Sequence, residues 1–257
     1  MAEAVSGKYP GRAIFVGIAA NCEPVALYML AGRNPTSRER LLRPYSCNSF
    51  DYVRTVSLSG KKDPILNYIA MIKPKNRDVL IGSNGTQTDN IYVAIETGSS
   101  LEDAVRDGLK MWKAEPDSSH TARIACAVGM HTAALGIIRF GEDEPSVREI
   151  DLNTISAGEF VGLSTYKIDT PDTDIPDYFK DGNEGWKMSL GGNGLGSPKE
   201  VLEELANRFA IRTNDYRVTW NDGTETPTLV GVVAAYAVSP SPPIPPFEIR
   251  NVLEPKP

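Results

Sequence analysis

The sequence predicts an α+β protein in which sheets are covered by helices in layers. Short runs of β-branched and aromatic residues, bounded by Gly, Pro, Asn or Asp, recur along the whole chain. Helical periodicity is confined to a few segments in the middle of the chain and near its end, so the strands and helices do not alternate as βαβ units do. The predicted strands cover residues 13–19, 25–30, 53–58, 68–72, 79–81, 123–128, 135–140, 160–165, 217–220 and 229–238.

Two helices are predicted from their capping residues and their apolar faces. Apolar residues over 101–112 fall on one helical face, and Ser99-Ser100 stand where they can cap the start. Near the end of the chain Ser197 is placed to cap a second helix, in which Pro198 occupies the first position and Glu200 completes a capping box. Each helix therefore has a start signal and one face to bury.

A third helix is predicted from Thr88 to Gly98. Thr and Asp at its start and Gly at its end are the expected start and stop signals. The alternative is a strand through residues 91–93, because a short apolar run fits either structure. We favour the helix.

Composition and charge exclude several classes of protein. With 257 residues, 41% of them hydrophobic, the chain can bury a sizeable core, and without a Ser/Gly linker residues 1–238 are expected to form one domain. The net charge of -6 argues against nucleic-acid or anionic membrane partners. The sequence has no apolar run of about 18 residues and no signal-peptide pattern. We therefore expect a cytoplasmic protein.

The spacing of cysteine and histidine shows no sign of a disulfide framework or a metal site. Cys22, Cys47 and Cys126 show no CxxC spacing. His120 and His131 lack the i, i+4 relation of a helical zinc motif. We expect reduced cysteines, no metal and no cofactor.

Residues 239–257 are predicted to form a separate Pro-rich C-terminal arm. Their composition favours an extended polyproline segment that lies on the surface or on a neighbouring subunit. A partly disordered end is the alternative. We also expect the protein to be a homo-oligomer.

The stretch SNGTQTD, residues 83–89, separates two apolar segments. If it leads from a strand into a helix, its backbone N–H groups and hydroxyl groups converge at the positive end of the helix dipole, where anions and polar ligands bind. Gly85 would allow a ligand to approach the backbone closely. An ordinary turn is one alternative, and the formal glycosylation sequon of residues 84–86 is another.

Arginines are concentrated just after the predicted strand 25–30. Arginine forks bind phosphate oxygens in a bidentate manner, and loops after strands commonly carry binding groups. In an acidic chain, an anionic ligand needs such a local cluster. The alternative is a solvated basic surface. The residues are Arg33, Arg38, Arg40 and Arg43.

The order and spacing of several short segments between about residues 12 and 166 carry a family resemblance. They are Gly32-Arg33 with Ser37-Arg38-Glu39-Arg40, Asp63-Pro64 with Asn67-Tyr68, SNGTQTD, Glu115-Pro116-Asp117-Ser118 with Thr121-Ala122-Arg123-Ile124-Ala125, and Gly162-Leu163-Ser164-Thr165-Tyr166. Together they resemble the archaeal-type inosine monophosphate (IMP) cyclohydrolase family. Two positions depart from its pattern: Ala122 stands where the family usually shows Pro, and Gln87 where it often shows His.

The resemblance implies both a fold and an activity. The fold would be a four-layer αββα sandwich of mainly antiparallel sheets covered by helices, similar to that of the N-terminal nucleophile (NTN) hydrolases. The activity would be reversible cyclisation of 5-formamidoimidazole-4-carboxamide ribonucleotide (FAICAR) to IMP plus water, the last step of purine synthesis. The expected partner is thus a purine nucleotide, and the reaction requires neither a metal nor a cofactor.

The resemblance also implies roles for particular residues. Tyr68 would donate to the formyl oxygen as its charge develops, Arg33 or Arg38 would support that charge, and Glu115 would accept the carboxamide proton. By position alone, Tyr68 fits a core aromatic residue and Glu115 an exposed residue after a helix. Asn84 would read a base-edge amide. The expected substrate-binding residues are Arg40, Ser83, Asn84, Gly85, Thr86, Thr88, Asp89 and Arg123.

Two other functions stay open. The first is a purine-nucleotide-binding protein of the same fold without turnover, since a fold does not imply an activity. The second is an amide hydrolase of the NTN class, which needs Cys, Ser or Thr as the mature first residue. Only cleavage before Ser6 or Cys22 would create one.

Overall fold

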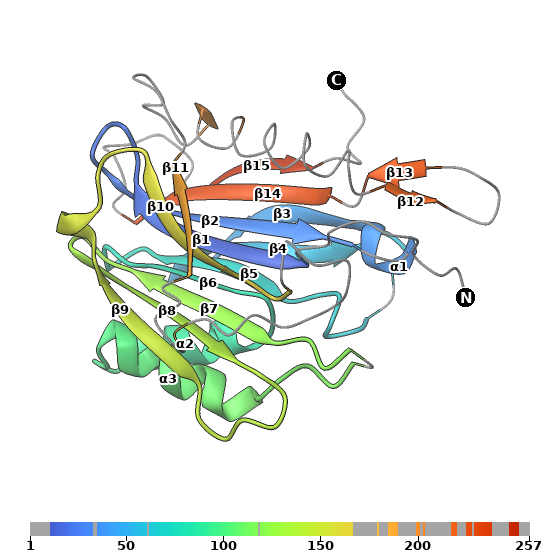
Figure 1. Cartoon of the computed structure of the whole chain (residues 1–257), viewed down its shortest axis with the longest axis horizontal. Helices are drawn as coiled ribbons and strands as arrows, with labels where there is room; N and C mark the ends of the chain where they lie inside the picture. The colour runs from blue at the N-terminus through green and yellow to red at the C-terminus, as the bar shows by residue number, and fades with distance from the viewer. Residues whose placement is uncertain are drawn as a thin grey trace.

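Two antiparallel sheets packed face to face form the centre of the molecule (Figure 1). The structure is a computed structural model that describes residues 11–32, 35–60, 62–117, 119–166, 179, 185–189, 199–200, 203, 217–219, 225–227, 229–237 and 247–251. Within these ranges the strands greatly outnumber the helices. The predicted α+β class is therefore confirmed.

The first sheet has six strands in the order β11-β10-β1-β2-β14-β15. Its central strands β1 and β2 are buried along their whole length, which explains their near-continuous apolar sequences. The strands are β1 (Arg12–Ile18), β2 (Pro24–Ala31), β10 (Glu159–Ser164), β11 (Trp186–Ser189), β14 (Leu229–Tyr236) and β15 (Phe247–Asn251).

The second sheet has seven strands that follow one another in chain order, β3-β4-β5-β6-β7-β8-β9. A separate two-stranded sheet pairs β12 (Arg217–Thr219) with β13 (Glu225–Pro227). The strands of the second sheet are β3 (Arg40–Ser46), β4 (Phe50–Ser57), β5 (Ile69–Pro74), β6 (Leu80–Ser83), β7 (Arg123–Val128), β8 (Thr132–Ile138) and β9 (Ser146–Asp151), and the 3-10 turn η1 (Leu152–Thr154) follows.

Successive side chains along each strand point alternately to the inner face of the sheet, which packs against the other sheet, and to its outer face. Ile14 and Val16 of β1 belong to the core cluster between the sheets, together with Leu135 of β8. Phe15, the residue between them, belongs to a cluster on the opposite face of the six-stranded sheet. By the same period, Arg12 is placed on the inner face, so β1 begins with a charged side chain directed between the two sheets.

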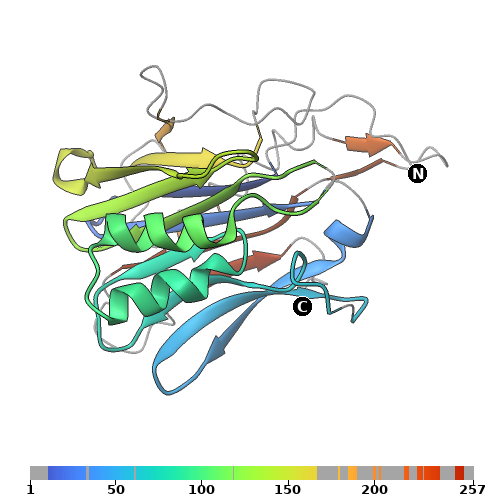
Figure 2. The ribbon, with the colours of Figure 1, turned by 90° about the horizontal axis from the view of Figure 1, so that it is seen from below.

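Two helices cover the outer face of the seven-stranded sheet (Figure 2). They are α2 (Gln87–Glu96) and α3 (Leu101–Trp112), which confirms the helix rather than the strand after SNGTQTD. Ser100 caps α3 as predicted, because its hydroxyl accepts from the Asp103 N–H. Among the described residues, no helix is both long and apolar enough to cross a membrane.

The predicted strands correspond to β1, β2, β4, β5, β6, β7, β8, β10, β12 and β14, with shifted ends. In the arginine-rich segment, in contrast, residues 35–38 form the helix α1 (Pro35–Arg38), and Arg40 and Arg43 belong to the strand β3. Within the predicted Pro-rich arm, residues 247–251 form β15. Residues 199, 200 and 203 of the predicted capped helix are helical. The remaining residues of that helix and of the arm lie outside the described ranges.

Asn251 joins the edge strands of the two sheets. Its Oδ1 accepts from the Leu42 N–H at 2.8 Å, and its Nδ2 donates to the Leu42 carbonyl at 3.0 Å. Leu42 belongs to β3, the outermost strand of its sheet, whose edge would otherwise present open backbone groups. β15 therefore holds β3 in place two residues beyond Arg40.

Replacing the amide of Asn251 tests this junction. We expect Asn251→Leu to lower the free energy of unfolding by about 1–3 kcal/mol, because the N–H and C=O of the buried Leu42 lose their partner. Urea denaturation measures the change. Asn48→Leu, at an exposed position, is the control and should change stability by less than about 0.5 kcal/mol. Equal stability of the two variants would contradict the junction.

Candidate active site

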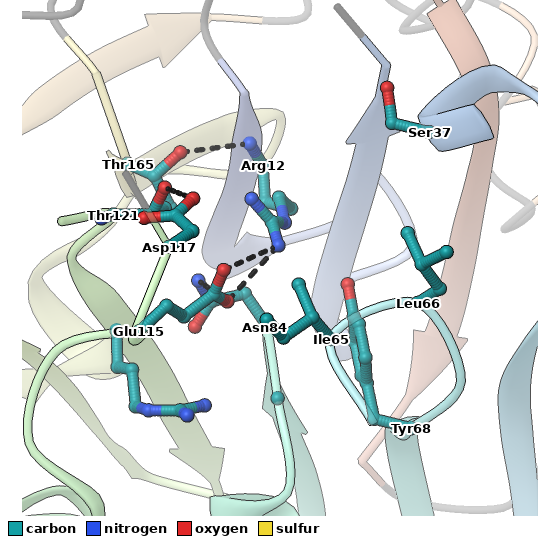
Figure 3. Close-up of polar contacts among 12 residues, drawn as sticks. Arg12, Ser37, Ile65, Leu66, Tyr68, Asn84, Glu115, Asp117, Thr121 and Thr165 are labelled. Carbon is teal, nitrogen blue, oxygen red and sulfur yellow. Dashed lines mark hydrogen bonds and ion pairs between the residues drawn. The ribbon is translucent and has the colours of Figure 1, made fainter. Parts of the chain in front are cut away.

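A buried ion pair links the two sheets at one end of the sandwich. Arg12 begins β1, and Glu115 lies in the loop between α3 and β7 (Figure 3). The Arg12 Nη2 donates to both carboxylate oxygens of Glu115, at 3.0 Å and 2.9 Å. Arg12 is only 7% exposed and Glu115 only 2%. Burial raises the pKa of the Glu115 carboxyl, while the charges of Arg12 and Arg123 oppose that shift.

The loop that carries Glu115 is held in a bend by Asp117. One carboxylate oxygen of Asp117 accepts from the Thr121 N–H at 2.8 Å, and the other accepts from the Thr121 hydroxyl at 2.5 Å. The Glu115 N–H donates to the Thr121 carbonyl at 2.9 Å and so closes the bend. Since the Thr121 hydroxyl proton goes to Asp117, its oxygen accepts from the Tyr166 hydroxyl. The bend fixes the backbone from which Glu115 extends.

Asn84 connects the SNGTQTD loop to Glu115. Its Nδ2 donates to the Ala122 carbonyl at 2.9 Å and more weakly to Glu115 Oε1 at 3.4 Å. Its Oδ1 accepts from the Ile124 N–H at 2.8 Å and from Gln87 Nε2 at 3.0 Å. All the hydrogen-bonding positions of this buried amide are thus taken. Asn84 therefore orients Glu115, and its role of reading a base edge stays a prediction.

The other hydroxyl groups of the loop also bond within the protein. The hydroxyls of Ser83 and Thr88 contact each other, and both bond to the Gly85 carbonyl. Thr88 Oγ1 also lies 2.6 Å from the Ile69 carbonyl. Ser83 and Thr88 are buried. Their hydroxyls shape the turn into α2, and their binding of substrate stays a prediction.

Thr86 and Asp89 lie at the start of α2, one at the N-cap position and the other on the solvent side of the first turn. Thr86 is the N-cap residue, but its side chain makes no capping hydrogen bond. Asp89 lies on the solvent side of the helix, where partial burial raises its pKa and Arg54 of β4 lowers it. The described contacts connect Asp89 to β4 and not to Glu115.

Arg123 lies at the start of β7, between the strand and the helix layer. Its Nη1 donates to Gln87 Oε1 at 2.9 Å, and its guanidinium carbon lies 5.8 Å from the centre of the Trp112 ring. A Cβ atom on Gly85 would lie 2.1 Å from this Nη1, so residue 85 has to be glycine for the close approach. Burial lowers the pKa of Arg123, and Glu115 raises it. Within the described ranges, its buried Nε has no hydrogen-bond partner.

Tyr68 stands just before β5, with its hydroxyl 2.5 Å from that of Tyr28 on β2. Its backbone is fixed by Thr55 of β4: the Tyr68 N–H donates to Thr55 Oγ1, and the Thr55 N–H donates to the Tyr68 carbonyl. Figure 3 shows the Tyr68 hydroxyl directed toward the side on which Arg12 and Ser37 lie. Tyr68 thus extends from the seven-stranded sheet toward the six-stranded sheet that carries Arg12 and Tyr28.

Arg40 is a buried cation at the start of β3. It is 2% exposed, and its Nε donates to the Ser37 carbonyl at 2.6 Å. Its Nη2 reaches the Ala31 carbonyl at 3.4 Å, while its Nη1 has no partner among the described residues. The same part of the chain holds no carboxylate paired with Arg40. A buried guanidinium with an unused N–H is suited to an anion.

Of the three other arginines of the predicted cluster, the structure describes two, Arg38 and Arg43, and Arg43 is an exposed residue of β3. Arg38 ends α1 and is buried. A Cβ on Gly32 would lie 2.7 Å from the Arg38 Cγ, so glycine at this position lets the short helix pack closely. Arg33 lies outside the described residues.

Three contributors to the site were not singled out by sequence reasoning. Arg12 carried a signal, because it is a charged residue that opens an otherwise apolar strand. Asp117 stood within the Glu115-Pro116-Asp117 segment without a role of its own. Tyr28 carried no signal, since an aromatic residue in an apolar run is the normal content of a core strand. Its position beside Tyr68 follows only from the packing of the two sheets.

Cys22, a potential nucleophile of the NTN alternative, lies far from this cluster. It is exposed in the turn between β1 and β2. Arg12 stands at the opposite end of β1, roughly 20 Å away at about 3.3 Å per residue. In the described ranges, no group of three His, Cys, Asp or Glu residues could hold a metal ion.

The fold and the site define a class of protein: a two-sheet α+β protein with a carboxylate, two phenols and several guanidinium groups buried at one end of the sandwich. A family model described as "IMP cyclohydrolase-like protein" matches residues 9–180. The IMP cyclohydrolase of Methanothrix thermoacetophila is 35% identical over 160 residues, which are 62% of this chain and 74% of that protein. That of Methanocella arvoryzae is 37% identical over 79 residues, 30% of this chain and 38% of that protein. The chain belongs to the IMP cyclohydrolase-like family, as the resemblance predicted.

Removing Arg12 tests the ion pair. We expect Arg12→Met to lower the free energy of unfolding by about 3–5 kcal/mol at neutral pH, because Glu115 becomes an unpaired buried carboxylate. The pKa of Glu115 is already raised in the folded protein and would rise further without Arg12. The difference in free energy of unfolding between the wild type and Arg12→Met should therefore grow as pH increases above the ordinary glutamate pKa of about 4.3. It should disappear below that pH. Urea denaturation at several pH values measures this.

Two further variants control this experiment. Arg12→Met combined with Glu115→Leu removes both charges and should recover much of the lost stability. Lys113→Met removes a cation from the exposed pair with Asp143 and should have a far smaller effect. A deficit that is independent of pH and persists in the double variant would contradict the ion-pair interpretation.

Proposed function

We propose that this protein is an IMP cyclohydrolase, which closes the ring of FAICAR to give IMP and water and catalyses the reverse hydrolysis. The observation that carries the proposal is Glu115. It is a buried carboxylate, held by Arg12 and Asn84, in the same cluster as the Tyr68 hydroxyl and in a chain of the cyclohydrolase-like family. Both residues occupy positions that the resemblance implied as catalytic.

The reaction needs polarisation and proton transfer more than it needs binding energy. The carboxamide nitrogen attacks the formyl carbon of the same molecule, and the resulting tetrahedral adduct loses water. Because the reacting groups are tethered, much of the roughly 7–11 kcal/mol that orientation can supply is already present. What the protein has to add is a donor for the formyl oxygen and a base for the carboxamide.

Glu115 is the proposed base. Burial raises the pKa of its carboxyl, which makes it a stronger proton acceptor than a solvated glutamate. Arg12 and Asn84 keep it oriented, and the charge of Arg12 opposes the rise of its pKa and so favours the ionised form. A positioned base of this kind contributes about 10²- to 10⁴-fold to the rate.

Tyr68 is the proposed donor to the formyl oxygen. A donor preorganised for the charge of the transition state contributes about 3–4 kcal/mol. Arg38, and Arg33 in the same segment, are proposed to support the developing charge, as the family resemblance implies. The formyl oxygen would leave as water with two protons, the carboxamide proton accepted by Glu115 and the proton of the formamido nitrogen, so that Tyr68 and Glu115 return to their starting states.

The nucleotide is proposed to bind through N–H groups that the protein itself leaves unused. Arg40 Nη1 is buried without a partner in the described chain, and it suits a phosphate oxygen. The Nε of Arg123 has the same property and suits an oxygen of the base or ribose. Thr86, at the start of α2, would offer its backbone N–H. The Gly85 N–H already donates to Ser83 Oγ at 3.3 Å, so Gly85 is retained as a candidate on the family resemblance. Asp89 is retained as a candidate only on the family resemblance.

We also propose that the complete fold is the four-layer αββα sandwich of NTN-hydrolase type. The helix layer and the two sheets supply three layers. The outer face of the six-stranded sheet carries a second buried apolar cluster, including Phe15, Leu27 and Phe160, which a fourth layer would cover. The capped helix predicted from Pro198 onward is the candidate for that layer.

Some expectations from the sequence stay predictions. These are a homo-oligomer and a cytoplasmic location without nucleic-acid or membrane partners. Size-exclusion chromatography with light scattering tests the first of them.

A turnover assay with FAICAR tests the proposed function directly. The absorbance change as FAICAR becomes IMP should show turnover by the wild type. We expect Tyr68→Phe to lower kcat by about 10²- to 10³-fold, because the oxyanion loses its donor. Glu115→Gln should lower it by about 10²- to 10⁴-fold, because the base is lost.

Matched substitutions at exposed positions serve as controls. Tyr45→Phe and Glu149→Gln make the same chemical changes away from the cluster and should keep wild-type turnover. Wild-type rates in both Tyr68→Phe and Glu115→Gln would exclude this mechanism. Binding of IMP by the wild type without cyclisation or hydrolysis would instead identify a nucleotide-binding protein without turnover.

A further inference from the structure

Tyr28 supplies the second hydroxyl of a phenol pair that bridges the two sheets. Tyr28 belongs to β2 of the six-stranded sheet and is fully buried, while Tyr68 precedes β5 of the seven-stranded sheet and is 2% exposed. Their hydroxyl oxygens are 2.5 Å apart. Tyr28 pairs with Ile14 on β1, and Arg12 is two residues before Ile14, so the side chains of Tyr28 and Arg12 lie on the same face of the sheet.

The two hydroxyls have two protons, and only one of these can lie between the oxygens. In the described part of the chain, neither hydroxyl forms a hydrogen bond to any other group. A buried hydroxyl proton without an acceptor is unfavourable. When a carbonyl oxygen accepts the proton of Tyr68, both protons are satisfied only if Tyr28 donates to Tyr68.

The charges around Tyr28 agree with its role as donor. Burial raises the pKa of the Tyr28 hydroxyl well above its usual range, and Tyr68 raises it further. Arg12 and Arg40 lower that pKa without reversing the shift. Tyr28 therefore keeps its proton at neutral pH. The guanidinium groups of Arg12 and Arg40 would stabilise negative charge that develops on the Tyr28–Tyr68 pair.

We propose that Tyr28 is a positioning residue of the cyclisation reaction, which donates a hydrogen bond to Tyr68 and thereby directs the Tyr68 O–H at the substrate oxygen. Hydrogen bonds in a chain polarise one another, so accepting from Tyr28 makes Tyr68 a stronger donor as charge develops on that oxygen. Tyr28 contacts Tyr68 and not the substrate. This inference rests on the proposed cyclohydrolase function and adds to it the group through which Tyr68 is oriented.

Kinetic analysis of Tyr28→Phe tests the inference. The substitution removes one oxygen atom from a buried ring, and urea denaturation first establishes that the variant folds. We expect kcat to fall by about 5- to 10-fold, the loss of one hydrogen bond. The KM for FAICAR should change less than twofold, because the interaction strengthens only in the transition state.

The double variant Tyr28→Phe/Tyr68→Phe separates positioning from general damage. If Tyr28 acts through the Tyr68 hydroxyl, the double variant should have the same kcat as Tyr68→Phe alone. Tyr236→Phe, a buried tyrosine of the neighbouring strand β14 in the outer cluster, is the matched control and should stay within twofold of the wild type.

The outcomes distinguish this inference from the proposed function. A normal kcat for Tyr28→Phe, or effects of the two substitutions that multiply in the double variant, would overturn the role of Tyr28 while the cyclohydrolase function stands. Absence of FAICAR turnover by the wild type would overturn both.

Discussion

The arrangement of the site depends on one interaction, the buried ion pair of Arg12 and Glu115. Taking either charge out of water costs several kcal/mol, which is offset only when the partner is held in good geometry. Its two ends come from different layers, because Arg12 opens a strand of the six-stranded sheet and Glu115 lies in the loop entering β7 of the seven-stranded sheet. The pair therefore fixes the sheets relative to each other where the phenols and guanidinium groups also gather.

A directed series of hydrogen bonds extends from this pair into the helix layer. Arg123 can only donate, so Gln87 must receive that bond on its oxygen and use its nitrogen to donate to Asn84 Oδ1. The Ile124 N–H reaches the same oxygen, which leaves the Asn84 nitrogen facing Glu115. Each amide has one orientation compatible with its neighbours. In a low dielectric, such a satisfied network keeps the carboxylate in a defined position.

Local signals predicted the elements but not the contacts that make the site. The capped helix at residues 101–112 and the helix after SNGTQTD were correct, because N-caps and apolar stripes act within one or two turns. The arginine-rich segment was predicted as a loop because it follows a predicted strand. It is partly a strand, because the burial of Leu41 and Leu42 and the pairing of β3 with β4 outweigh the local composition. The hydroxyls of Ser83 and Thr88 were assigned to a ligand, but they are used within their own turn.

The sequence by itself determined the α+β class, most strands and two helices, and through the family resemblance it singled out Tyr68, Glu115 and Arg40 as candidate site residues. The spacing of apolar residues along the chain and a few short motifs are enough to indicate these features. Tertiary structure alone decided which groups meet: Arg12 reaches Glu115 across a separation of 103 residues, and Tyr28 reaches Tyr68 across 40. No local pattern encodes such contacts, because they arise only when two separately patterned sheets bury their inner faces against each other.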